Sequence, residues 1–413
     1  MRLNKEQWCW LLYDPGNAAF ALLVRAVFAP LVFMSCVKGV WSESSATANW
    51  GLLCSFSGVA AGALSLYFGA LADGRSKRKL ALLISTVIGV AASVMLAFSH
   101  DYRWIMVIYF IGLAAYMVGN SFYDSLLISV AKPVEYSKLS TMAYGFGYMG
   151  GFLPFIIILG VGLWLKNKLL TAQIAFIFAG VWWFLWSLPL FFKVKESTAG
   201  QHSMRWFDGF KQLYESLKKV FSDRNARLFL IAYFLYIDGV STILLMAAPL
   251  SVSIGMSEVM FMGAILALQF IGFPATVGVG ALAGRIGTRK VVYGLLAIYT
   301  TVAALVGAIS LSTGYTVKLT LFLVVAFLIA LAQGGIQSLS RSLFGTLVPP
   351  ERAAEYFSVY NIFGKFTTLL GPILIYLASM WWHKSEYGIV LLIVPFVLGG
   401  TMLARVKFPE TKN

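Results

Sequence analysis

Long apolar runs separated by short polar segments make up most of the chain. They lie at 8–37, 47–72, 80–98, 104–130, 139–165, 170–192, 227–253, 258–283, 290–312, 318–346, 356–382 and 387–405. Each run is long enough to cross a bilayer as a helix, which takes about 20 apolar residues. A longer polar stretch from Lys193 to Arg227 separates the sixth run from the seventh. The pattern predicts an all-α membrane protein with twelve transmembrane helices in two groups of six.

Composition supports a membrane location. Hydrophobic residues make up 59% of the chain and charged residues 12%, against about 45–50% and about 25% in ordinary soluble domains. The net charge of +15 would suggest nucleic acid in a soluble protein. In a membrane protein it has a simpler cause, because cytoplasmic loops collect Lys and Arg. No nucleic-acid partner is therefore expected.

The distribution of Lys and Arg indicates the orientation. With a cytoplasmic N-terminus and strict alternation, most of the 32 Lys and Arg residues fall on the inside. The outside loops then contain only Lys38, Arg103, Lys166, Lys168, Lys318 and Lys384. This bias predicts that both termini are cytoplasmic.

Three pairs of similar segments show that the two groups of helices repeat each other. Residues 69–79 read GALADGRSKRK and residues 280–290 read GALAGRIGTRK, each between the second and third helix of its group. The second pair is Tyr13-Asp14-Pro15-Gly16 with Tyr236-Ile237-Asp238-Gly239. The third pair is Ala131-Lys132-Pro133, followed by Glu135, with Val348-Pro349, followed by Glu351. Parallel six-helix repeats are the architecture of major facilitator transporters.

The repeat predicts three parts. We expect an N-terminal bundle at 1–193, a cytoplasmic linker at 194–226 and a C-terminal bundle at 227–413. Apolar residues recur at helical spacing between Trp206 and Phe221, with lysines among them. This pattern predicts an amphipathic linker helix on the inner leaflet. A solvated linker helix without lipid contact is the alternative.

Six ionisable residues lie within the predicted spans, where charges are costly and face the bundle interior or a wet cavity. They are Asp14, Asp124, Asp238, Arg25, Arg341 and Lys365. Counted along their helices, Asp238 and Lys365 lie near the midplane. A buried carboxylate such as Asp238 can carry a proton, because burial disfavours its charged form. Lys365 could hold an anionic group of a solute, or the two residues could form a structural ion pair.

The remaining chemistry argues against an enzyme. Cys9, Cys36 and Cys54 form no disulfide or metal pattern, and the three histidines lack metal-ligand spacing. The run Gly145-Phe-Gly-Tyr-Met-Gly150 matches a dinucleotide fingerprint, but no strand precedes it. Small residues in this membrane helix predict close helix packing instead. We expect no cofactor, no metal and no ATP hydrolysis.

Several motifs point to one family. They are Tyr13-Asp-Pro-Gly-Asn17-Ala-Ala-Phe20, Tyr123-Asp-Ser-Leu-Leu127, Gly147-Tyr-Met-Gly-Gly151, Phe234-Leu-Tyr-Ile-Asp238-Gly-Val-Ser-Thr242, Gln333-Gly-Gly-Ile-Gln-Ser-Leu-Ser-Arg-Ser342, and Gly364-Lys365 followed by Gly371-Pro372. Together they resemble the "unidentified major facilitator" family, which is related to the fungal vacuolar amino-acid effluxers. The family's first motif usually has tryptophan and alanine where this chain has Pro15 and Gly16. A kink in the first helix is expected there.

The resemblance implies a major facilitator fold, with helices 1, 4, 7 and 10 around a central cavity. It also implies that the 69–79 loop, through Asp73 and Arg78, braces a cytoplasmic gate. Asp124 and Arg341 would then face each other across the inner mouth as a gate pair. The same resemblance places Asp238, Lys365, Arg25, Asp14 and Asn17 at the site of solute binding or proton coupling.

We therefore expect a secondary active transporter that works by alternating access, coupled to protons. Paired acids and bases favour an amino acid or another zwitterion, with efflux as the favoured direction. An organic-anion, siderophore or drug carrier is the alternative within this fold. A channel, a non-transporting receptor or a polytopic enzyme are the alternatives outside it. Short loops favour a bacterial inner membrane and a monomer.

Overall fold

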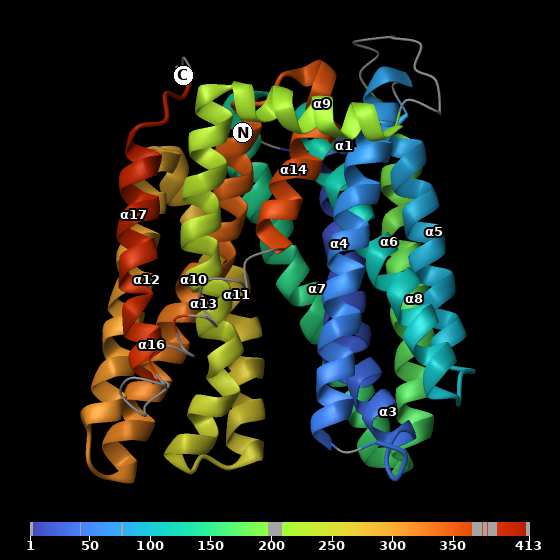
Figure 1. Cartoon of the computed structure of the whole chain (residues 1–413), viewed down its shortest axis with the longest axis vertical. Helices are drawn as coiled ribbons and strands as arrows, with labels where there is room; N and C mark the ends of the chain where they lie inside the picture. Colours follow the sequence, from blue (N-terminus) through green and yellow to red (C-terminus); the bar gives the residue numbers. More distant parts are fainter. Residues whose placement is uncertain are drawn as a thin grey trace. The chain divides into compact units, whose positions relative to one another are not determined.

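The structure is a computed structural model and consists of helices (Figure 1). It describes residues 3–41, 43–75, 77–196, 209–365, 374, 378 and 386–409. Within these ranges the only β-type pairing is an isolated bridge between Lys38 and Trp41. The expectation of an all-α protein is confirmed.

Ten helical spans within the described ranges are long and apolar enough to cross a membrane. A shorter apolar helix follows at Gly388–Ala404, where the twelfth span is expected. The eleventh span begins with α14 (Ala353–Lys365), and its expected continuation to 382 lies largely outside the described residues. At most of their ends, the observed helices differ from the predicted runs by a few residues. One example is α6, which spans Tyr102–Val130 where the predicted run is 104–130.

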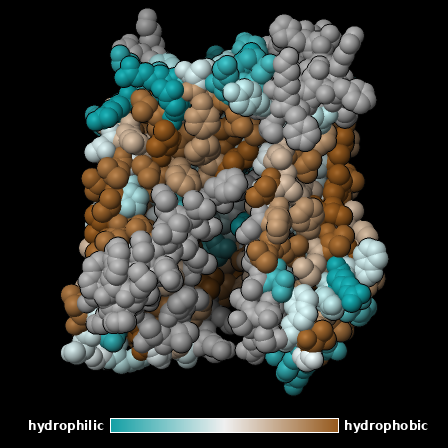
Figure 2. All heavy atoms as spheres, in the orientation of Figure 1, coloured by the Kyte–Doolittle hydropathy of each residue, from teal (hydrophilic) through white to brown (hydrophobic). Residues whose placement is uncertain are grey.

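Large apolar side chains cover the outside of the helices. Trp104, Leu163 and Trp164 expose 64%, 71% and 81% of their surface. Figure 2 shows hydrophobic residues over the sides of the helices and hydrophilic residues gathered towards helix ends. A soluble protein rarely exposes such large apolar areas, whereas lipid is the natural solvent for them.

The chain forms two compact units, and they do not simply follow the two sequence halves. Unit 1 comprises residues 1–132, 146–219 and 348–361, and unit 2 comprises 133–145, 220–347 and 362–413. Each unit therefore includes a short segment from the other half of the sequence. We call these two segments, 133–145 and 348–361, the exchanged segments.

The helices of unit 1 begin near the N-terminus. They are α1 (Lys5–Leu11), α2 (Tyr13–Ala19), the π-helix η1 (Phe20–Phe28), α3 (Ala29–Cys36), α4 (Glu43–Arg75), α5 (Arg78–Leu96), α6 (Tyr102–Val130), most of α7 (Tyr136–Leu165), α8 (Lys168–Lys193), most of α9 (Gly209–Ser222), the 3-10 helix η4 (Pro350–Arg352) and most of α14.

The helices of unit 2 include the exchanged start of α7. They are the 3-10 helix η2 (Pro133–Glu135), α10 (Arg224–Ile254), α11 (Glu258–Ile286), α12 (Thr288–Leu311), α13 (Tyr315–Gly345), α16 (Glu386–Leu391) and α17 (Ile393–Ala404). Within this unit α12 packs on α13, α13 on α11, and α10 on α17.

The first span is irregular on both sides of the Pro15-Gly16 pair. The α-helix is interrupted at Leu12, and a nine-residue π-helix follows from Phe20. Pro15 itself lies in the first turn of α2, where its missing N–H is not needed. These irregularities flank the pair, while α2 runs through Pro15 and Gly16, and a kink at the pair stays a prediction. π-helical segments are frequent at functional sites.

The linker contains the expected helix, α9, over Gly209–Ser222. Lys218 and Lys219 are exposed, and Val220 is buried. Trp206 and Phe207, the first apolar residues of the predicted helix, lie outside the described residues. The contact of this helix with lipid stays a prediction.

Candidate functional site

Asp14 and Asn17 lie on one face of α2 and contact α6 inside unit 1. The hydroxyl of Tyr123 donates a hydrogen bond to Asp14 Oδ2 at 3.2 Å. The side-chain amide of Asn17 donates to Asn120 Oδ1, while Asn17 Oδ1 is buried without a hydrogen-bond partner. A buried polar atom of this kind is costly to leave unsatisfied. Asn17 Oδ1 therefore offers an acceptor on the same face of α2 as Asp14, and a donor group of a solute could bind it.

Aromatic stacking fixes the position of Tyr123. Its ring lies between those of Trp10 and Tyr13, with centroids 4.6 Å and 4.7 Å away. The indole of Trp10 also donates to the Tyr123 carbonyl at 3.1 Å. Stacked aromatic rings stabilise a defined side-chain geometry. The Tyr123 hydroxyl is therefore held in place against Asp14.

Arg25 does not belong to this cluster. It lies on η1, and its side chain is exposed. No hydrogen bond from its guanidinium to another described residue is found. The structure thus brings Asp14 and Asn17 together but leaves Arg25 apart, and a role for Arg25 in solute binding stays a prediction.

Asp238 is completely buried in α10 of unit 2, with 0% of its surface exposed. One turn further along the helix, Thr242 is also fully buried, and its hydroxyl has no hydrogen-bond partner. Lys365 ends α14, but its side chain lies outside the described residues. The expected pairing of Asp238 with Lys365 therefore stays a prediction.

The exchanged segment 348–361 is held inside unit 1 by three hydrogen bonds to different helices. Asn361 Nδ2 donates to Asp124 Oδ2 on α6 at 2.9 Å. Ser358 Oγ donates to the Ser65 carbonyl on α4 at 2.8 Å. Arg78, at the start of α5, donates to the Pro350 carbonyl at 2.6 Å. Two of the predicted gate residues, Asp124 and Arg78, thus hold the same segment. The side chain of Asp73 lies outside the described residues.

The exchanged segment 133–145 is held in the same manner inside unit 2. Arg341 on α13 donates to Ser140 Oγ at 2.8 Å and to the Ser140 carbonyl at 3.2 Å. Its guanidinium also lies 4.5 Å from the centroid of the Tyr144 ring. Only 1% of the Arg341 surface is exposed. Arg341 is therefore a buried polar anchor of this segment.

Corresponding glycines of the two repeats allow these contacts. A Cβ at Gly69 would lie 2.8 Å from Ser358 Oγ and 3.1 Å from the Ala354 carbonyl. A Cβ at Gly280 would overlap with the Thr141 side chain. The glycine that opens each repeated loop therefore permits close approach of the exchanged segment. We name these two sets of contacts the 348–361 latch and the 133–145 latch.

The comparisons with known proteins agree with this architecture. The family model described as "Vacuole effluxer Atg22 like" matches residues 129–413. An MFS-type transporter of Bacillus subtilis, YxiO, is 32% identical over 98% of this chain and 95% of its own length. The chain belongs to the Atg22-like family of major facilitator transporters. Autophagy-related protein 22 of Kluyveromyces lactis is 24% identical over 94% of this chain and 79% of its own length.

Solved structures show the same fold. The proton:xylose symporter XylE aligns with a TM-score of 0.75 at 15% identity, over 99% of this chain and 96% of its own. The human organic anion transporter MFSD10 aligns with a TM-score of 0.71 at 18% identity, over 96% and 98%. The Atg22-like chain is thus a multi-pass integral membrane transporter and not an enzyme, as the sequence predicts.

Sequence reasoning missed the uncharged partners of the latches in this Atg22-like transporter. The predicted spans include Ser140, Ser358 and Asn361. A search for ionisable residues within the spans does not find them, because their side chains are uncharged. Their signal was present, because a hydroxyl or amide in an apolar run also needs a partner. Glu196 was missed because it lies in the polar linker, where carboxylates need no explanation.

Glu196 caps the start of α5. Its carboxylate accepts from the backbone N–H groups of Arg78 and, at 3.3 Å, Lys79. The N-cap residue, Lys77, supplies no side-chain acceptor of its own. We expect Glu196→Ala to lower the free energy of unfolding by about 1 kcal/mol, the usual effect of losing a cap. Thermal unfolding in detergent measures this, with Glu215→Ala on exposed α9 as the control. Equal stability of the two variants would show that the cap contributes nothing.

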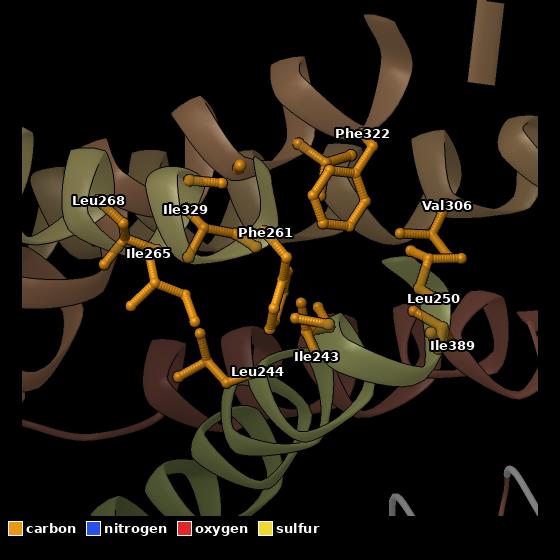
Figure 3. A pocket seen from close by; sticks show the side chains of 14 residues that line it. Ile243, Leu244, Leu250, Phe261, Ile265, Leu268, Val306, Phe322, Ile329 and Ile389 are labelled. Atoms are coloured by element: carbon orange, nitrogen blue, oxygen red, sulfur yellow. The ribbon is translucent and has the colours of Figure 1, made fainter. Parts of the chain in front are cut away.

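One cavity in unit 2 is apolar. Its volume is about 50 Å³, and its walls come from α10, α11, α12, α13 and α16. Figure 3 shows the side chains of Phe261, Ile243 and Phe322 pointing into it. All of its described lining side chains are apolar. A site of this composition does not suit a polar solute, so the buried polar residues of α2, α6 and α10 remain the candidates.

Proposed function

We propose that this transporter is a secondary active carrier that moves an amino acid or a related zwitterionic metabolite by alternating access, coupled to protons. The observation that carries the proposal is the complete burial of Asp238 within a transmembrane helix. A carboxylate in such a position is costly when charged. Proton uptake removes this cost, so the proton and the solute can be bound in a coupled manner.

The zwitterionic substrate follows from the polar groups that the spans contain. Asp14, held by Tyr123, suits an ammonium group, and Asn17 offers an unsatisfied amide oxygen beside it. Lys365 is the candidate for a carboxylate. The resemblance to vacuole effluxers favours export, and the Bacillus relative favours a bacterial plasma membrane. Asp14, Asn17, Asp238 and Lys365 are the proposed solute and proton residues, with Arg25 as a further candidate.

An organic-anion carrier is the second candidate. The likeness of the fold to a human organic anion transporter favours it. The exposed guanidinium of Arg25 within the first span would suit an anion without an ammonium group. The two candidate substrates differ in what they offer Asp14. A zwitterion has an ammonium group that the carboxylate can bind, whereas an anion without one is repelled by it.

Transport by the purified chain in proteoliposomes tests the proposal. Labelled amino acids and labelled dicarboxylates are offered in counterflow and under an imposed pH gradient. We expect saturable counterflow of an amino acid and its accumulation when a pH gradient is applied. Asp238→Asn should retain counterflow but lose the accumulation driven by pH, because the amide cannot take up a proton.

The control is Glu215→Gln, which makes the same change on exposed α9. Undiminished pH-driven accumulation by Asp238→Asn would refute the proton role. Counterflow of dicarboxylates without any amino acid flux would favour the organic-anion carrier instead. Linear, unsaturable flux would indicate a channel.

A further inference from the structure

A large basic cavity lies in unit 2, at the ends of α11, α13 and α17 and the start of α12. Its volume is about 1080 Å³. Among its 21 described lining residues none is acidic, and six are basic: Lys138, Arg285, Arg289, Lys290, Arg405 and Lys407. Such a concentration of one sign of charge in a concave site attracts anions.

The start of α12 adds backbone donors to this cavity. Its N-cap residue is Gly287, with φ 96°, which has no side chain that could cap the helix. Thr288, Arg289 and Lys290 form the first turn, and all three line the cavity. The first N–H groups of a helix have no partner within it. An anion placed there would accept hydrogen bonds from them and would face the positive end of a 24-residue helix.

The first repeat shows what fills the corresponding position there. Arg78 and Lys79 lie in the first turn of α5, as Arg289 and Lys290 lie in the first turn of α12. The N–H groups of Arg78 and Lys79 are capped by the Glu196 carboxylate. The first half of the chain thus supplies its own anion to this helix start.

The second repeat lacks both acids of the first. At the end of the last helix of each half the sequence reads Lys193-Val194-Lys195-Glu196 and Arg405-Val406-Lys407-Phe408. The two valines are buried alike, with 1% and 2% of their surface exposed. Phe408 therefore stands where Glu196 stands in the first half, and Gly284 stands where Asp73 does.

Phe408 and the end of α17 fix Arg289 at the cavity wall. The guanidinium lies 5.8 Å from the centroid of the Phe408 ring. It also donates to the Leu403 carbonyl at 3.2 Å and to the Ala404 carbonyl. These acceptors are uncharged, so the positive charge of Arg289 is oriented without being neutralised by them.

We propose that this cavity binds a phosphate-bearing anion, which takes the place of the missing Glu196 carboxylate. Phosphate suits the site because helix N-termini and Arg side chains bind its oxygens. The predicted cytoplasmic location allows two sources. One is the headgroup of an anionic lipid of the inner leaflet, and the other is a soluble phosphate compound. The proposal is independent of the solute that is transported.

Phe408→Glu is the decisive variant, because it restores the carboxylate of the first repeat without removing a basic residue. The full chain in phosphatidylcholine nanodiscs is titrated with inorganic pyrophosphate by calorimetry. We expect saturable binding of pyrophosphate. In Phe408→Glu the introduced carboxylate competes for the site, and the affinity should decrease by at least about tenfold. Phe408→Gln is the matched control and should bind within about threefold of the parent on the same scale.

The source of the phosphate group is tested by repeating the titration with phosphatidylglycerol in the nanodisc. Weaker apparent pyrophosphate binding by the parent chain, while the residual binding of Phe408→Glu stays the same in both lipids, assigns the site to the lipid headgroup. Unchanged binding assigns it to a soluble compound.

Three results would overturn the proposal. One is an absence of pyrophosphate binding together with an absence of any effect of phosphatidylglycerol on stability. The second is an equal loss of binding in Phe408→Gln and Phe408→Glu. The third is binding that appears only in Glu410→Gln, because Glu410, which lies outside the described residues, would then be the chain's own occupant. Lys168→Gln, an exposed change on α8, controls for diffuse attraction by surface charge.

Discussion

Replacement of Gly150 by alanine is expected to lower the free energy of unfolding by about 3 kcal/mol, the upper part of the usual range for overpacking. A Cβ at Gly150 on α7 would overlap with the backbone of Pro15 on α2, including its Cα and carbonyl oxygen. A backbone cannot turn aside as a flexible side chain can, so the two helices must move apart. Thermal unfolding in detergent should show a decrease of about 3–4 °C for a chain of this length.

Gly160→Ala is the matched control for this prediction. It lies on the same helix, and nothing lies within 4 Å of a Cβ placed there. The two substitutions therefore have the same helix propensity term and differ only in packing. Equal melting temperatures of the two variants would show that α7 does not approach α2 as closely as the structure indicates.

The effect of Gly150→Ala should also reach the candidate site. Pro15 is adjacent to Asp14, whose Cβ lies 3.8 Å from a Cβ built at Gly147 on the same face of α7. Displacement of α2 would therefore move Asp14 away from the Tyr123 hydroxyl. The glycine pattern on this helix, which predicts close helix packing from the sequence, has its physical reason in this contact.

Arg341→Gln is expected to open the 133–145 latch. Arg341 makes two charge-assisted hydrogen bonds to Ser140 and a cation–π contact with Tyr144. A hydrogen bond to a charged group contributes about 1.5–3 kcal/mol. A loss of that size shifts an equilibrium between held and released states by roughly tenfold to a hundredfold. Alternating access requires such a release, so the variant should favour the released state and transport more slowly.

Cysteine labelling measures the release. Ser342 on α13 is buried, and its hydroxyl lies 2.8 Å from Ser137 Oγ of the exchanged segment. In a chain without Cys9, Cys36 and Cys54, Ser342→Cys should react with a maleimide at least about tenfold faster when Arg341 is Gln. Arg103→Gln, the same change at an exposed site, should leave the rate unaltered. An unaltered rate in Arg341→Gln would mean that Arg341 does not hold the segment.

The two latches suggest a different role for the predicted gate pair. The sequence placed Asp124 and Arg341 opposite each other at the inner mouth. In the structure each contacts a segment from the other half of the sequence, Asp124 through Asn361 and Arg341 through Ser140. Direct pairing of Asp124 with Arg341 stays a prediction. Within its own unit each residue instead holds an exchanged segment through a hydrogen bond.

The sequence alone determined the class of the molecule and the location of most spans. This was possible because lipid imposes a simple rule on every segment: an apolar run of sufficient length must form a helix that satisfies its own backbone. The repeat at 69–79 and 280–290, the charges within spans and the family motifs are equally local. They can be recognised without knowing which helices touch.

Only the tertiary structure decided which side chains meet. Residues 133–145 pack with unit 2 and residues 348–361 with unit 1, and the sequence does not say which unit either segment joins. Ser140 and Asn361 matter because of the Arg341 and Asp124 side chains that they contact, and Gly150 matters because Pro15 lies against it. Hydropathy records how each residue interacts with lipid or water, whereas these contacts depend on shape and distance between helices far apart in the chain.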